Sequence, residues 1–204
     1  MSRTAKTFAA VLIVAVAVVA GVFLRHAVEE PLGVSVATAV KPFTLIDHNG
    51  RPVTDATFRG RALLLFFGFI RCPDVCPTSM SFAADLLNAL GDSAGTLQIA
   101  FVTVDPERDT PEALRDYLAN FDSRIAGLTG TPEQIAAVTK AFGVYYAKRA
   151  LEGLDDYTMD HSTAFYLVST NGQFHRAFAL NDDSDEMIDE LRAAISAASS
   201  PQKE

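Results

Sequence analysis

The chain has 204 residues, of which 49% are hydrophobic, and its 25 acidic and 17 basic residues give a formal net charge of −8. This acidic balance argues against nucleic-acid binding, which needs a basic face, and against peripheral binding to anionic lipid. The length suits one ordinary domain with a proper core, with an apolar segment left over.

The first 25 residues differ in character from the rest of the chain. Residues 8–24 form an unbroken apolar run, preceded by Arg3 and Lys6 and followed by Arg25. The run is at the short end for a membrane span and long for the core of a signal peptide. We therefore predict that residues 1–25 are a cytoplasmic tip and an uncleaved membrane anchor helix, with a cleaved signal peptide as the alternative.

Both interpretations place the rest of the chain outside the cytoplasm, because the basic flank of such a segment stays inside. We expect a single-pass protein of the cell inner membrane, with its N-terminus inside and its domain on the periplasmic side. We predict that residues 26–40 are a polar tether, that residues 41–198 are the folded domain, and that residues 199–204 are a tail.

From residue 41 onward, apolar runs typical of strands alternate with amphipathic stretches typical of helices. The first part predicts strands over residues 43–47, 51–54, 62–69 and 97–104. The turn Asn49–Gly50 joins the first two as a hairpin, and the last two are continuous apolar runs, as in strands buried on both faces. Residues 77–90 have apolar side chains at helical spacing and end at Gly91, a good helix C-cap.

Two later helices begin with the same pair of residues. Thr110–Pro111 and Thr131–Pro132 each offer an N-cap threonine with proline at the first helical position, and Gln134 completes a capping box behind Thr131. The chain then predicts a hairpin over residues 165–178 and a closing helix over residues 183–198. This order implies an α/β fold in which a central sheet is flanked by helices.

The only two cysteines, Cys72 and Cys76, stand between a buried strand and the helix that starts near Pro77. Cys76 is expected at or next to the helix N-cap, where free backbone N–H groups and the helix dipole favour a thiolate. Thiolates attack disulfides and bind soft metals. The pair therefore predicts a structural disulfide, a thiol–disulfide exchange centre or a metal site.

The three roles differ in what they require from the chain. A structural disulfide would close a very short loop, worth only about 2 kcal/mol by loop entropy. Thioredoxin-type exchangers normally have two residues between the cysteines and a proline facing them. This chain has three residues there and no proline between Pro132 and Pro201. Closed zinc sites need four ligands and iron–sulfur clusters four cysteines, so one copper ion on two thiolates and an imidazole is the economical solution.

The sequence offers four candidates for that imidazole: His26, His48, His161 and His175. His26 adjoins the anchor, His48 lies in the first hairpin turn, and His175 lies within a later strand. His161 stands in Asp160–His161–Ser162, just before a buried strand, where its loop can face the cysteine loop. Sequence does not show spatial proximity, so the residues alone leave the third ligand open.

These segments together resemble the SCO/SenC family of copper-binding assembly factors. The resemblance rests on Phe-Gly-Phe-Ile-Arg-Cys-Pro-Asp-Val-Cys-Pro at residues 67–77, on Val-Thr-Val-Asp-Pro-Glu-Arg-Asp-Thr at residues 102–110 and on Asp-His-Ser at residues 160–162. It extends over residues 42–191. We interpret the second segment as architecture, a turn from strand to helix that ends in a cap.

The resemblance implies a thioredoxin-like fold and one copper ion per chain, as Cu(I) or Cu(II), bound by Cys72, Cys76 and His161. Residues 157–161 would then be a flexible segment that carries the third ligand. The implied function is that of a metallochaperone rather than an enzyme. It would receive copper from an upstream donor and help to assemble the dinuclear copper centre in the copper-bearing subunit of cytochrome c oxidase.

Two other functions use the same residues. A thiol–disulfide reductase would keep the copper-ligand cysteines of the oxidase reduced through a redox disulfide between Cys72 and Cys76, without using His161. A redox or copper sensor would transmit the state of the site to a membrane partner.

Overall fold

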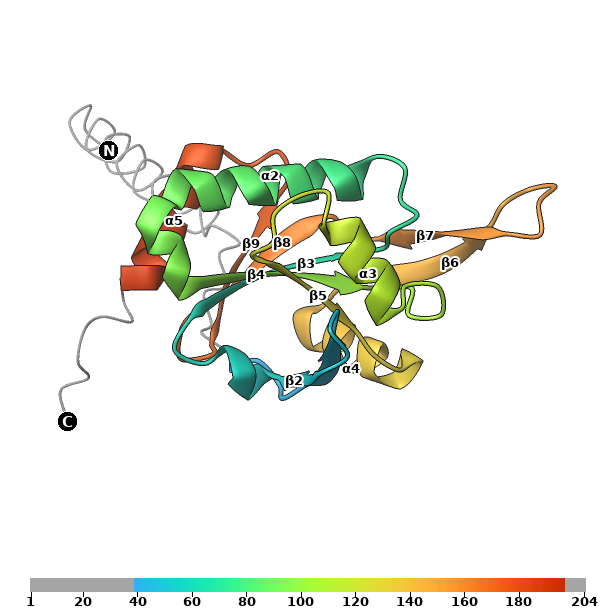
Figure 1. Ribbon diagram of the computed structural model, residues 1–204, viewed down its shortest axis with the longest axis horizontal. Helices are drawn as coiled ribbons and strands as arrows, with labels where there is room; N and C mark the ends of the chain where they lie inside the picture. The colour runs from blue at the N-terminus through green and yellow to red at the C-terminus, as the bar shows by residue number, and fades with distance from the viewer. Residues whose placement is uncertain (1–38, 197–204) are drawn as a thin grey trace, which may run out of the picture. The chain divides into compact units, whose positions relative to one another are not determined.

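The computed structural model describes residues 39–196, so the predicted anchor, most of the tether and the tail lie outside the described residues. A seven-stranded sheet forms the centre, with the spatial order β2-β1-β5-β4-β3-β8-β9 (Figure 1). Its strands are β1 Thr44–Asp47, β2 Pro52–Thr54, β3 Ala62–Gly68, β4 Leu97–Thr103, β5 Ile125–Thr129, β8 Ala164–Val168 and β9 Phe174–Ala179.

The middle of the sheet explains the continuous apolar runs in the sequence. Strand β3 pairs in parallel with β4 and antiparallel with β8, and all seven of its residues are buried. Phe66 packs on one face against Phe101 and Phe165, while Phe67 packs on the other against Phe142. A strand with apolar neighbours on both faces has no polar alternation.

Helices cover both faces of the sheet. They are α2 Val75–Leu90, α3 Pro111–Leu118, α4 Pro132–Phe142 and α5 Ser184–Ser196, with two 3-10 turns, η1 Asp55–Phe58 and η2 Gly91–Thr96. Figure 1 shows α2 and α5 together over one face and α4 beneath the other. This mixed α/β arrangement confirms the predicted fold class of a central sheet flanked by helices.

The predicted helix starts at the two threonines are confirmed by their hydrogen bonds. The Thr110 hydroxyl accepts from the backbone N–H of Ala113 at 3.2 Å. Thr131 and Gln134 form the reciprocal capping box, with distances of 2.8 and 3.3 Å. Each cap satisfies backbone donors that the first helical turn leaves free.

Helix α2 begins two residues earlier than predicted. Its N-cap is Asp74, so Cys76 is the second residue inside the helix rather than the N-cap residue or its neighbour. Pro77 still lies in the first turn, where its missing N–H costs no hydrogen bond. The shift changes which sulfur accepts hydrogen bonds from the free backbone N–H groups of the first turn.

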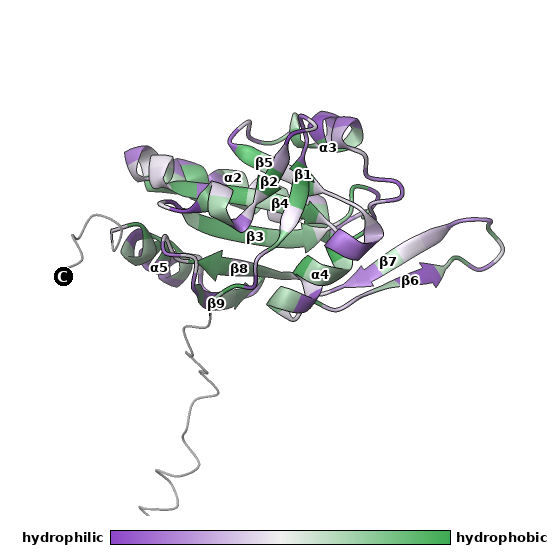
Figure 2. Ribbon diagram, turned by 90° about the horizontal axis from the view of Figure 1, so that it is seen from below, coloured by the Kyte–Doolittle hydropathy of each residue, from purple (hydrophilic) through white to green (hydrophobic). Residues whose placement is uncertain are grey.

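A separate two-stranded hairpin extends from the body of the domain (Figure 1). It consists of β6 Tyr146–Ala150 and β7 Tyr157–His161. Residues 157–161, predicted to be a flexible segment that carries the third ligand, form a strand that pairs in register with β6, and their flexibility stays a prediction. Figure 2 shows hydrophilic residues in both β6 and β7, unlike the green strands of the central sheet.

Strand β5 was also missed, because its five residues, Ile-Ala-Gly-Leu-Thr, are too few and too small to form a clear apolar run. Within residues 39–196, no helix combines the length and the apolar character needed to cross a membrane.

Candidate metal centre

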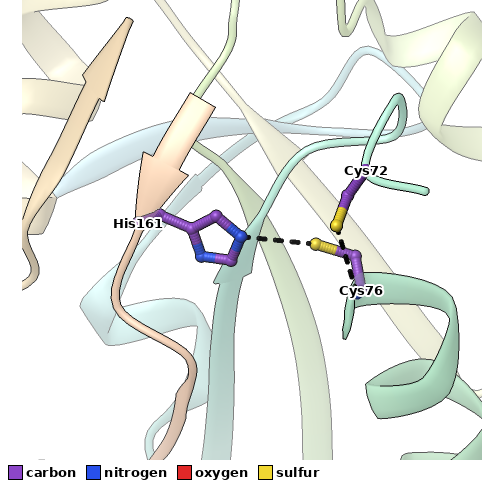
Figure 3. Close-up of side chains that lie close together, drawn as sticks. All are labelled: Cys72, Cys76 and His161. Carbon is purple, nitrogen blue, oxygen red and sulfur yellow. Dashed lines mark hydrogen bonds between the residues drawn. The ribbon is translucent and has the colours of Figure 1, made fainter. Parts of the chain in front are cut away.

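Three side chains from separate parts of the chain meet beyond the carboxyl end of β3 (Figure 3). Cys72 lies in the loop after β3, Cys76 in the first turn of α2, and His161 at the end of β7. Their two sulfurs and one ring nitrogen all lie within 4.8 Å of one another. Ligands of open α/β sheets commonly bind at this edge. The structure thus brings together the three residues proposed from sequence, and both cysteines are free thiols.

Gly68, the last residue of β3, makes room for the sulfur of Cys76. A Cβ atom at this position would lie 2.7 Å from Cys76 Sγ and 2.9 Å from the ring of Phe101. Both distances are too short for real contacts, so any larger residue would displace the thiol or the ring. Sequence reasoning missed this role, although Gly68 stands within the segment that carries the family resemblance.

The start of α2 directs a backbone donor at Cys72. The N–H of Cys76 points to Cys72 Sγ at 3.5 Å, and the N–H of Cys72 donates to the carbonyl of Phe69 at 3.2 Å. The free N–H groups of the helix therefore stabilise the Cys72 thiolate, and not that of Cys76 as the sequence suggested.

The two thiols have opposite acidities. A hydrogen bond from the Cys76 thiol, helped by the backbone N–H groups of Asp74 and Cys76, lowers the pKa of half-buried Cys72 to about 5 against the effect of burial. The same hydrogen bond, together with burial, raises the pKa of Cys76 well above its ordinary value. At neutral pH the site therefore holds one thiolate, at Cys72, and one fully buried thiol, at Cys76.

His161 is oriented by its own backbone neighbour. Its Nδ1 lies 2.9 Å from the carbonyl oxygen of Ser162. A carbonyl only accepts hydrogen bonds, so Nδ1 carries a proton, and Nε2 faces Cys76 Sγ, 3.6 Å away. The rings of Phe66 and Phe69 meet the imidazole edge-on, both at 87°, and limit its rotation.

The spacing of the donor atoms suits a soft metal ion. Bonds of about 2.3 Å to sulfur and 2.0 Å to nitrogen, at about 110–120°, place these atoms about 3.5–3.7 Å apart. The observed separation of Cys76 Sγ and His161 Nε2 is 3.6 Å. In the part of the chain that the structure describes, no other histidine, cysteine or carboxylate joins the group.

Two of the other histidines have partners far from this site. His48 Nδ1 accepts from the backbone N–H of Gly127 at 2.8 Å, and His175 lies 3.3 Å from Glu190 on the surface. His26 lies outside the described residues. Of the histidines that the structure describes, His161 is the one placed to act as a ligand.

Buried polar groups behind the cysteines add negative charge, and sequence reasoning missed them. Asp109 Oδ2 accepts from Thr103 Oγ1 at 2.6 Å and from the backbone N–H of Ile70 at 3.1 Å. Burial raises the pKa of Asp109 to about 6, and its charge opposes ionisation of Cys76. A bound cation would offset this repulsion.

Comparisons with known proteins give a consistent result. The SCO1/SenC family model matches residues 34–196. Protein sco1 of Schizosaccharomyces pombe is 42% identical over 151 residues, which are 71% of this chain and 56% of the relative. The chain thus spans little more than half the length of that curated relative.

Solved structures agree with the sequence matches. ScoI of Bradyrhizobium japonicum, solved with copper bound, is 40% identical with a TM-score of 0.71, covering 78% of this chain and 99% of that one. BsSco, described as having a disulfide switch and as a member of the Sco family of cytochrome c oxidase assembly proteins, is 26% identical with a TM-score of 0.63. That match covers 79% of this chain and 95% of BsSco.

Proposed function

Because this chain belongs to the SCO1/SenC family, we propose that it is a copper metallochaperone that binds one copper ion through Cys72, Cys76 and His161. The observation that carries the proposal is the placement of His161 Nε2 at 3.6 Å from Cys76 Sγ, across 85 residues of sequence. A thiol–disulfide centre needs no imidazole at this distance, whereas a three-ligand metal site does.

The donor set favours copper over other soft metals. Two thiolates and one imidazole satisfy Cu(I) and are also tolerated by Cu(II), while a structural zinc site is normally closed by four ligands. Three protein ligands leave a position free for a donor group of a partner. An incomplete coordination shell of this kind suits an ion that is bound temporarily and then transferred to a partner.

The two cysteines would act in sequence during loading. The Cys72 thiolate is half-exposed and already ionised at neutral pH, so it makes the first bond to arriving copper. Cys76 then loses its proton to water as the cation approaches, and Nε2 of His161 supplies the third bond. Transfer to a partner begins at the same residue, because an incoming thiolate reaches the exposed Cys72 bond first.

We place this activity at the periplasmic face of the inner membrane, with residues 1–25 as the anchor. The proposed recipient is the copper-bearing subunit of cytochrome c oxidase, where the ion would enter the dinuclear copper centre, and an upstream protein would supply it. Support comes from the oxidase-assembly description of the BsSco family and from the basic-flanked apolar run over residues 8–24.

The test is copper stoichiometry and affinity of the reduced full chain, measured by competition with a chelator. We expect one copper ion per chain. His161→Ala should lower the copper affinity at least about 10- to 100-fold, because it removes one group that binds the metal. His175→Ala is the matched control and should leave the affinity unchanged. Wild-type protein that cannot compete with a modest Cu(I) chelator would contradict the proposal.

A second candidate function rests on the opposite acidities of the two thiols. In a thiol–disulfide reductase, the Cys72 thiolate attacks a substrate disulfide, and one substrate sulfur leaves as a thiol. Cys76 then resolves the mixed disulfide, so that the pair is oxidised and the substrate gains two thiols. Full biological activity of His161→Ala would favour this function over copper transfer.

A further inference from the structure

The hairpin that carries His161 has no strand pairing with the central sheet. Strands β6 and β7 form a two-stranded sheet of their own. Beneath them lies a cavity of about 170 Å³, whose lining includes Ile135 of α4, Tyr146 and Met159. No backbone ladder to the central sheet therefore fixes the hairpin, so the position of His161 depends on side-chain contacts.

Alternate residues of β7 point to the same face of the strand. Tyr157, Met159 and His161 share one face, and Met159 is buried there with 5% of its surface exposed. His161 reaches Cys76 from this face at the end of the strand. Tyr157 marks the other end of the same face, four residues away.

Tyr157 is held by the turn that follows β4. Its hydroxyl donates to Asp105 Oδ1 at 2.8 Å, and the Arg108 guanidinium lies 3.7 Å from the centre of its ring. Arg108 also forms an ion pair with Asp105, and its Nη1 donates to the carbonyl of Tyr157 at 2.9 Å. One tyrosine thus has its hydroxyl, its ring and its backbone bound by two residues.

The Asp105 and Arg108 side chains are shielded from solvent, unlike those of most ion pairs on the surface of the domain. The side chains of Asp105 and Arg108 are 0% and 13% exposed. Hydrogen bonds and charge pairs in such surroundings are weakened little by water and salt. The nearby pair of Lys148 and Glu107 is about half-exposed on both sides and adds little.

The same turn also fixes the cysteine loop. Asp109, next to Arg108, accepts the backbone N–H of Ile70, two residues before Cys72. The turn over residues 105–109 therefore contacts both halves of the candidate metal site, which come from distant parts of the chain.

We infer that Asp105, Arg108 and Tyr157 form a positioning clamp that sets the distance between His161 and the two cysteines. This inference deepens the proposed copper function and rests on it. The segment Asp-Pro-Glu-Arg-Asp, interpreted above as architecture alone, then acts on the metal site through the hairpin. None of the three clamp residues is itself a ligand.

Tyr157→Phe tests the clamp with the smallest change, because it removes only the hydroxyl that Asp105 accepts. Tyr145→Phe is the matched control, since Tyr145 stands at the base of the same hairpin with 62% of its surface exposed. The readout is Cu(I) affinity of the reduced full chain, for each variant in the wild-type and the His161→Ala background. We expect Tyr157→Phe to weaken binding about 3- to 10-fold in the wild-type background.

The double substitution decides whether the effect passes through His161. In the His161→Ala background, Tyr157→Phe should change the affinity no further, because the residue being positioned is gone. An equal loss in both backgrounds, or no loss in the wild type, would overturn the inference. Tyr145→Phe should bind copper like the wild type in both.

Hydrogen exchange of the copper-free chain gives a readout that does not depend on the proposed function. Backbone amides of β6 and β7 should exchange faster in Tyr157→Phe than in wild type, while those of α2 stay unchanged. Unchanged exchange in the hairpin would overturn the clamp even if copper binds. If wild-type binding does not depend on His161, the proposed function fails, while accelerated exchange still supports the clamp.

Discussion

The two halves of the candidate copper site are built in different ways. The cysteine half grows out of the core: it follows a strand buried on both faces, and Cys76 Sγ fills the space beside Gly68. The histidine half stands on a hairpin outside the central sheet and is held by the buried Met159 and by polar contacts to the turn over residues 105–109. The comparison teaches that close packing fixes the sulfurs, whereas the position of the third ligand depends also on hydrogen bonds that a single substitution can remove.

The largest expected effect separates the two cysteines by reactivity. With its pKa lowered to about 5, Cys72 should be alkylated by iodoacetamide at neutral pH more than about 100-fold faster than buried Cys76. The Cys72 rate should fall as the pH is lowered through about 5, because the thiolate is then protonated. Mass spectrometry of the reduced chain across this pH range measures both rates.

The same experiment on Cys76→Ala sharpens this prediction. Loss of the Cys76 thiol removes the first cause of the acidity of Cys72, so the midpoint of its alkylation profile should move to higher pH. An unchanged midpoint would mean that the helix N–H groups alone stabilise the thiolate.

Gly68→Ala should break the packed half of the site. The new methyl group meets Cys76 Sγ and the Phe101 ring at under 3 Å, so the free energy of unfolding should fall by about 1–3 kcal/mol. Copper affinity should fall as well, because Cys76 is displaced. Urea denaturation and chelator competition measure the two effects.

Gly95→Ala is the control for this prediction, since nothing lies within 4 Å of the Cβ atom it would add. It should change neither stability nor copper affinity. Equal stability of Gly68→Ala and wild type would show that β3 and α2 adjust more easily than their burial indicates.

The smallest effect on stability is expected for the exposed ion pair between the hairpin and the turn that follows β4. Lys148→Met removes the ion pair with Glu107, whose side chains are 47% and 56% exposed. Solvent and salt screen such a pair, so the free energy of unfolding should stay close to that of the wild type, as measured by urea denaturation. A loss of copper affinity as large as that of Tyr157→Phe would mean that the hairpin is held over a wider surface than Asp105 and Arg108.

The sequence predicted well those parts whose physics is local. The apolar runs of β3 and β4 and the caps at Thr110 and Thr131 depend on neighbouring residues, and the structure confirms them. Residues 157–161 were predicted to be a flexible segment and not a strand, because a two-stranded hairpin whose two faces are both partly exposed to solvent shows no apolar periodicity. The contacts of Tyr157 depend on the folded geometry, which spacing in the sequence does not show.

The same distinction between local and folded geometry applies to the candidate site. The cysteines are four residues apart, so their pairing was visible in the sequence, whereas the nearness of His161 became an expectation through the family resemblance. The direction of the helix N–H groups was misjudged, because it depends on whether α2 begins at Val75 or at Pro77.

The sequence separation of 85 between Cys76 and His161 also bears on folding. Closing that loop costs roughly 3 kcal/mol more chain entropy than closing the four-residue cysteine loop. An unfolded chain therefore offers copper two sulfurs at most, and the imidazole joins them only after β3, β8 and the hairpin have assembled. Copper held by all three ligands would mark a chain that has finished folding, and its binding energy would add to the stability of that state alone.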